Sequence, residues 1–186
     1  TPASLSDAVA KQVEKTLAKA DALSATVKNR DFRLIYQPVV ALSDGSAHHF
    51  EVLVRFGDNG SPFPMIRMAE ELDMIEDLDL AVAEQAIAVM AKFKNARLAV
   101  NISGRTIITD SFMTRITSMI DAAPHCRGRL MFEVTESAAI EDLALADRHI
   151  QVLRQRKCHV CLDDFGAGAA SLAYLQQLAL DVVKLD

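Results

Sequence analysis

The chain has 186 residues, of which 51% are hydrophobic and 24% charged, and its formal net charge is -5. This length suits one well-buried core and is short for two domains. The acidic balance and the absence of a basic run exclude a broad nucleic-acid-binding surface, so phosphate recognition depends on single arginines or lysines. Because no apolar stretch approaches a membrane span and no signal-peptide pattern is present, we expect a cytoplasmic protein without membrane contact, or one tethered through a region outside this chain.

Residues 4–29 are predicted to form a helix, because apolar residues recur at spacings of three and four. Pro2 and Ser4 suit its start. Two interpretations remain open, since the helix either packs on the following domain or ends a coiled-coil linker over residues 1–30. In the second case, it would join a second copy of the chain or another signalling protein.

Residues 33–42 and 47–56 are predicted strands on either side of a short turn at Ser43-Asp44-Gly45, which favours an antiparallel hairpin. Helices and strands alternate from there on, which indicates β-α-β units and a parallel sheet. The predicted helices cover 64–74, 78–93, 110–121, 141–156 and 170–178, and the strands cover 97–103, 129–137, 159–166 and 181–186.

Polar residues gather at the carboxyl ends of these strands, which is typical of an α/β protein with a (β/α) barrel. An open doubly wound sheet also builds its site there and remains the alternative. A complete barrel takes about 250 residues. For a chain of 186 residues we therefore expect either a partial barrel or, as we favour, a (β/α)8 barrel without its last two β-α units.

The cysteines are sparse and odd in number, which fits a reducing compartment. Cys158 and Cys161 have C-x-x-C spacing, but they enter an apolar, strand-like run in which a separation of three places side chains on opposite faces. We interpret them as buried structural cysteines and not as a redox or zinc motif. The histidines have no metal-binding spacing, and we interpret them as surface or packing residues.

Four residues with side-chain oxygens lie in or after apolar strand sequences: Glu51, Asn101, Glu133 and Asp163. The carboxyl ends of parallel strands meet at one mouth of a barrel, so these side chains should converge. Buried carboxylates are costly unless a cation or hydrogen bonds neutralise them. An all-oxygen set favours Mg²⁺ or Mn²⁺ over zinc, which predicts a divalent metal site. A salt-bridge network at the mouth is the alternative.

Glu51 and Arg55 share one face of a predicted strand, since successive side chains alternate between faces. Arginine binds phosphate through a planar, bidentate fork. A metal, an arginine and the strand-end Lys184 together indicate phosphoester chemistry, in which the lysine orients or deprotonates the attacking water. The alternative is that Glu51 and Arg55 only pair with each other.

Several motifs occur here in the order and spacing of the EAL domain: YQPVV, EVLVR, MAEELDMIEDLD, VNIS, FEVTES, LDDFGAGAASLAYL and DVVKLD. From about Phe32 to Asp186 the chain resembles this family. Its members hydrolyse the bacterial second messenger cyclic di-GMP to linear pGpG or bind it without hydrolysis. The resemblance implies an EAL domain over residues 31–186 and a modified barrel with an antiparallel first strand.

The resemblance also implies roles for individual residues. Asp164 would serve a second cation, and Glu51, Asp163 and Lys184 would carry catalysis. The metal would be Mg²⁺ or Mn²⁺, with Ca²⁺ able to bind and expected to inhibit. The implied metal ligands are Glu51, Asn101, Glu133, Asp163 and Asp164, and the implied positions in contact with cyclic di-GMP are Gln37, Leu53, Arg55 and Asp186.

The chain departs from the family pattern at several positions. Val52 stands for the alanine of the name-giving motif, and Phe56 for a tryptophan. In the loop after Asp164, GAGAAS replaces GTGYSS. These departures leave two functions open, a phosphodiesterase and a degenerate cyclic di-GMP receptor of the TipF kind that controls a partner in motility or flagellar positioning. The changed loop positions are Ala167, Ala169 and Ala170.

Overall fold

The computed structural model describes residues 5–57, 60–135, 140, 142–165 and 171–185. Within them, strands form one six-stranded sheet in the order β1-β2-β3-β4-β5-β6. From β2 on, helices separate successive strands along the chain, which confirms the predicted alternation of helices and strands. The strands are β1 Arg33–Val40, β2 Ala47–Arg55, β3 Leu98–Ile102, β4 Leu130–Thr135, β5 His159–Phe165 and β6 Val182–Leu185.

The first two strands pair antiparallel, as predicted, and every later neighbour pairs parallel. Gly45 closes the hairpin at a φ of 71°, which glycine adopts without a steric cost. The Asp44 carboxylate fixes the turn by accepting a hydrogen bond of 3.0 Å from the Ser46 amide. The resulting mixed sheet, with its antiparallel first strand, forms a six-stranded half-barrel, as expected for the predicted barrel without its last two β-α units.

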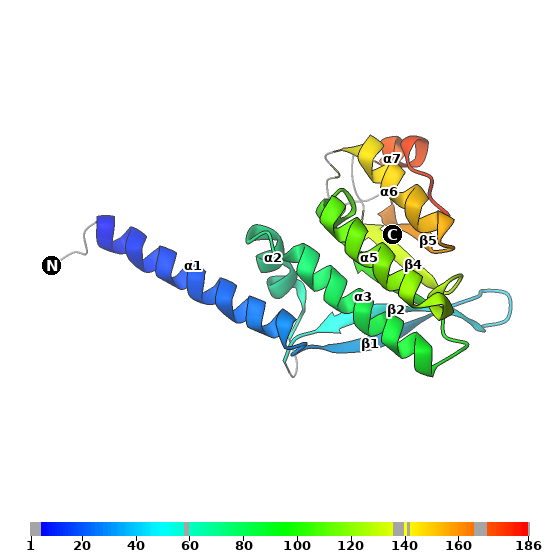
Figure 1. Ribbon diagram of the computed structural model, residues 1–186, viewed down its shortest axis with the longest axis horizontal. Coiled ribbons are helices and arrows are strands. Elements are labelled where there is room, and N and C mark those ends of the chain that lie inside the picture. The colour runs from blue at the N-terminus through cyan, green and yellow to red at the C-terminus, as the bar shows by residue number, and fades with distance from the viewer. Residues whose placement is uncertain (1–4, 58–59, 136–139, 141, 166–170, 186) are drawn as a thin grey trace.

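Helices α3 and α5 lie along one face of the sheet (Figure 1). Their buried apolar residues share one hydrophobic core with Val100, Phe132 and Val160 of the sheet, which are fully buried. The opposite face, along the inside of the half-barrel, carries the polar side chains. The helices are α1 Leu5–Lys28, α2 Phe63–Glu71, α3 Ile75–Lys92, α4 Gly104–Ile107, α5 Asp110–Ala122, α6 Leu143–Gln155 and α7 Ser171–Gln177.

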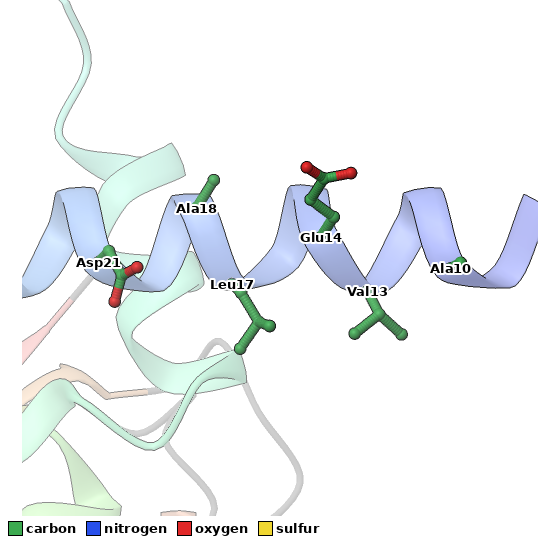
Figure 2. A pocket seen from close by; sticks show the side chains of 6 residues that line it. All are labelled: Ala10, Val13, Glu14, Leu17, Ala18 and Asp21. Carbon is green, nitrogen blue, oxygen red and sulfur yellow. The ribbon is translucent and has the colours of Figure 1, made fainter.

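Helix α1 extends away from the rest of the molecule (Figure 1). Near its end, Leu23 and Val27 are buried in the core of the domain, whereas the side chains of Val13 and Leu17 are more than half exposed. Figure 2 shows Val13 and Leu17 pointing the same way along this exposed stretch. One end of α1 therefore packs on the domain, and the domain boundary expected at residue 30 stays a prediction.

Two short elements were not predicted, the helix α4 and a 3-10 turn at Pro124–Cys126. The start of α4 depends on Ser103, whose hydroxyl accepts a hydrogen bond of 3.3 Å from the Arg105 amide. The Ser103 amide in turn donates to Asp79 of α3 at 2.9 Å. A contact between distant segments thus fixes the turn that follows β3, and local sequence patterns do not reveal such a contact.

Arg129 joins the base of the sheet, opposite the mouth, to the end of α3. It immediately precedes β4, and its guanidinium donates to carbonyl oxygens that follow or end neighbouring helices. Several of these carbonyls would otherwise lack a helical partner. The accepting residues are Met90, Phe93, Lys94, Ala96 and His125.

Asp79 gives the domain a stability that depends on pH. Burial raises the pKa of its carboxyl from 3.8 to about 7, although the Ser103 amide opposes this shift. Folding therefore favours the neutral acid. The contribution of the Asp79 carboxyl to the free energy of unfolding is complete below pH 3.8 and is lost as the pH rises to about 7.

We expect the free energy of unfolding of the parent protein to fall more steeply than that of Asp79→Asn between about pH 4 and pH 7. The difference in slope should reach about 1.4 kcal/mol per pH unit, since asparagine accepts the Ser103 bond but does not titrate. Urea unfolding followed by circular dichroism across this range measures both slopes. Equal slopes would contradict the prediction.

Candidate functional site

Four predicted metal ligands lie on the inner face of the sheet, near the carboxyl ends of its parallel strands: Glu51, Asn101, Glu133 and Asp163. Asn101 pairs with Glu133 in the register of β3 and β4, and Asp163 pairs with Thr135 in that of β4 and β5. Asp163 is therefore one inward-facing position closer to the mouth than Glu133. This stagger and the curvature of the sheet let side chains from separate strands converge.

Lys184 of β6 lies at the centre of the converging side chains. Its Nζ is 2.7 Å from Glu133 Oε1, 3.4 Å from Glu51 Oε2 and 3.4 Å from Asp163 Oδ2. Asn101 Nδ2 donates to Glu51 Oε1 at 3.1 Å. The structure thus brings together all five residues that the sequence predicted at the mouth.

The three acids, which we call the carboxylate cluster, are Glu51, Glu133 and Asp163. Glu133 is fully buried, and burial raises the pKa of its carboxyl to about 7, against the opposing effect of Lys184. Burial alone would lower the pKa of Lys184, but its interactions with the cluster more than offset this and raise it. Lys184 is therefore an ammonium ion at neutral pH.

The carboxylate cluster has the geometry of a cation site. One oxygen from each acid lies within 4.8 Å of the others. Among the described residues, Glu133 Oε2 is buried without a hydrogen-bond partner, an arrangement that a bound cation would relieve. The donors are carboxylate oxygens, which suit a hard divalent ion. The residues present therefore fit a divalent metal.

The other predicted positions lie around this cluster. Gln37 is opposite Glu51 in the hairpin register, and Leu53 and Arg55 follow on the same face of β2. In the described part of the chain, Glu51 forms its ion pair with Lys184 and not with Arg55. The alternative that Glu51 and Arg55 only pair with each other therefore gains no support.

Asp164 follows Asp163 in β5 with a φ of 56°. Its side chain is exposed, and its amide donates to Asp163 Oδ1 at 3.0 Å. It is not one of the converging acids of the carboxylate cluster, and its service to a second cation stays a prediction. The remaining predicted positions, Asp186, Ala167, Ala169 and Ala170, are outside the described residues.

His49 is a site residue that the sequence analysis missed by treating every histidine as a surface or packing residue. It is buried, and its Nε2 lies 3.8 Å from Glu133 Oε1. Burial lowers the pKa of His49, with further lowering by His48 and Lys184, so the ring is neutral at pH 7. The alternation of side chains along β2, which places His49 on the face of Glu51, was the signal available.

The cysteines are free and buried, as predicted. Burial raises the pKa of the Cys158 thiol to about 12 and that of the Cys161 thiol to about 12. A thiol with such a pKa is neither a ready nucleophile nor a ready metal ligand at neutral pH. The predicted burial of Cys158 and Cys161 is confirmed.

Residues 20–186 match the model of the EAL domain family, and the chain belongs to that family. It is 28% identical over 184 residues to the cyclic di-GMP phosphodiesterase PdeF of Escherichia coli, covering 95% of this chain and 24% of that protein. It is 31% identical over 179 residues to the cyclic di-GMP phosphodiesterase NbdA of Pseudomonas aeruginosa, covering 91% of this chain and 23% of that protein. The chain thus spans about a quarter of the length of these relatives.

Solved structures show the same fold. The EAL domain of FimX from Pseudomonas aeruginosa bound to c-di-GMP matches with a TM-score of 0.80 and 25% identity, over 92% of this chain and 71% of that one. An EAL domain protein from Listeria monocytogenes matches with a TM-score of 0.75 and 26% identity, over 90% of this chain and 68% of that one. Among the described residues, no helix has the length and apolar character needed to cross a membrane.

Lys184→Met should destabilise the protein, because it leaves the carboxylate cluster without its ammonium partner. Breaking a buried ion pair costs about 3–5 kcal/mol, and we expect the low end of this range because Lys184 is partly exposed. A divalent cation should restore the missing charge. Mn²⁺ should therefore raise the melting temperature of this variant more than that of the parent.

Thermal unfolding with EDTA and with Mn²⁺ measures both effects. Lys92→Met is the matched control, since it removes a lysine from the exposed end of α3. An equal response to Mn²⁺ in the parent and in Lys184→Met would show that the ammonium and the cation do not serve the same carboxylates.

Proposed function

We propose that this chain binds cyclic di-GMP at the mouth of the half-barrel and hydrolyses it to pGpG with a divalent metal. The observation that carries this proposal is the convergence of the carboxylate cluster on Lys184, with distances of 2.7 to 3.4 Å. The names of the relatives PdeF and NbdA, both cyclic di-GMP phosphodiesterases, agree with this chemistry.

In this proposal the carboxylate cluster and Asn101 hold Mg²⁺ or Mn²⁺, and Ca²⁺ binds there as an inhibitor. The bound ion would lower the pKa of a water molecule and stabilise charge on the phosphate. Lys184 is protonated beside the cluster in the metal-free protein, and we assign it the orientation of the attacking water and the stabilisation of negative charge. Asp164 would serve a second ion.

Arg55 is proposed to bind a phosphate of the ligand. It lies on the face of β2 that carries Glu51, and its Nη1 donates to the Val54 carbonyl at 2.8 Å. This bond uses one of several guanidinium N–H groups, which leaves donors for a bidentate contact. Gln37, Leu53 and Asp186 would contact the rest of the ligand.

The metal site is tested first by Glu51→Ala. Removal of one of the converging carboxylates should abolish detectable binding of Mn²⁺ in a calorimetric titration, together with any hydrolysis. Glu71→Ala is the control, because Glu71 is an exposed acid on α2 that pairs with Arg67. Equal Mn²⁺ affinity in the parent and in Glu51→Ala would rule out the assignment.

The phosphate contact is tested by Arg55→Ala in EDTA. A charged hydrogen-bonded contact contributes about 1.5–3 kcal/mol, so affinity for cyclic di-GMP should fall roughly ten- to a hundredfold, whether or not metal is present. Arg115→Ala removes the same charge from the outer helix α5, where Arg115 pairs with Asp77, and should bind like the parent. Unchanged affinity in Arg55→Ala would exclude this role.

A receptor that binds cyclic di-GMP without hydrolysis is the second candidate. The substitutions Phe56, Ala167 and Ala169 favour it. Incubation of the protein with cyclic di-GMP and Mn²⁺, followed by chromatography, separates the two functions. Release of pGpG supports the enzyme, and recovery of intact ligand by a protein that binds it supports the receptor.

The exposed stretch of α1 supports a further part of the proposal, contact with a second copy of the chain or with a signalling partner. Val9, Val13 and Leu17 are 55%, 53% and 61% exposed, although their spacing is that of a packed helix face. The same face is buried at Leu23 and Val27.

A further inference from the structure

A buried histidine lies directly beneath the carboxylate cluster. His49 precedes Glu51 by two residues on β2, so both side chains face the inside of the half-barrel, with His49 one position further from the mouth. Its side chain is 5% exposed, and its Nε2 has no hydrogen-bond partner among the described residues. Glu133 Oε1 lies 3.8 Å from this nitrogen.

The neighbouring ring determines which nitrogen of His49 carries the proton. His48 Nδ1 and His49 Nδ1 lie 2.9 Å apart, a hydrogen-bond distance at which one nitrogen donates and the other accepts. If His49 were the donor, the lone pair of its Nε2 would face the Glu133 carboxylate. If His48 donates, Nε2 of His49 carries its hydrogen toward that carboxylate. Electrostatics therefore favour the tautomer in which His48 donates.

We propose that His49 is a positioning residue of the metal site, whose Nε2–H orients the Glu133 carboxylate toward the cation. This inference rests on the proposed function, since it assumes that Glu133 holds a metal. Carboxylates that bind metals are themselves oriented by hydrogen-bond donors, and the loss of such a donor typically weakens metal binding about 10- to 100-fold.

Two other roles for His49 fit the structure less well. A direct ligand should lie close to all of the acids, but the converging group of the described residues contains Glu51, Glu133 and Asp163 without His49. A purely packing role leaves the polar ring unexplained, because an apolar side chain would fill the same space without the cost of burying an unpaired nitrogen. The position of His49 between His48 and Glu133 fits orientation of the carboxylate.

The test compares His49→Leu with His49→Gln. Leucine fills the space of the His49 ring with an apolar side chain and has no hydrogen-bond donor. The glutamine amide extends an N–H along a path similar to that of the His49 Nε2–H. We expect His49→Leu to bind Mn²⁺ about 10- to 100-fold more weakly than the parent in calorimetric titration, and His49→Gln to recover most of the affinity. Parent-like affinity in His49→Leu would overturn the proposal, as would an equal loss in both variants.

The tautomer supplies a readout that requires no variant to fold. Long-range ¹H–¹⁵N spectra of the parent should show His49 with a protonated Nε2 and a bare Nδ1. The opposite tautomer would overturn the proposal, because no N–H would then face Glu133. His159, which is partly exposed on β5, serves as the reference ring in the same spectra.

The same titrations separate this inference from the proposed function. If the parent binds Mn²⁺ and His49→Leu binds it equally well, the positioning role fails and the metal site stands. If the parent itself binds no Mn²⁺, the metal site fails, and the role of His49 fails with it. If binding is lost in Glu51→Ala, weakened in His49→Leu and largely recovered in His49→Gln, both assignments hold.

Discussion

The site depends on the charge balance between one ammonium group and three carboxylates. The strands bring Glu51, Glu133 and Asp163 together inside the half-barrel, where their mutual repulsion and the loss of hydration both oppose folding. Lys184 offsets part of this cost through its contacts with all three acids. The two sides of the balance appear in the pKa values: burial raises that of Glu133, and the contacts with the acids raise that of Lys184.

The framework that imposes this crowding is rigid. Parallel pairing holds β3, β4 and β5 in a fixed register, so Asn101, Glu133 and Asp163 cannot move apart without breaking backbone hydrogen bonds. The contact of Asp79 with the Ser103 amide fixes the turn beyond β3 from the helical side. The acids therefore form a preorganised charge pattern, whose geometry is maintained by the sheet and not by the charged groups themselves.

Much of this arrangement could be predicted from the sequence, because it follows from two short-range rules. Period-two alternation placed Glu51 and Arg55 on one face, and the polar residues that close apolar strands identified the mouth. The position of His49 followed the first rule too, but it was missed because the histidines were compared only with known metal motifs. The distance of 2.7 Å between Lys184 and Glu133 depends on the curvature of the sheet, and α4 depends on a contact across 24 residues, so neither could be predicted from local patterns.

Arg129 shows how unevenly tolerance to substitution is distributed in such a domain. Its guanidinium reaches the carbonyl oxygens of five residues at the base of the sheet, among them Met90, Phe93 and His125. Lysine has the same charge, but its compact ammonium group cannot spread donors over acceptors that lie in several directions. A change that conserves charge is therefore not conservative here. Position 129 lies at the end of the sheet that takes no part in the chemistry. It nevertheless tolerates fewer amino acids than many positions near the mouth do.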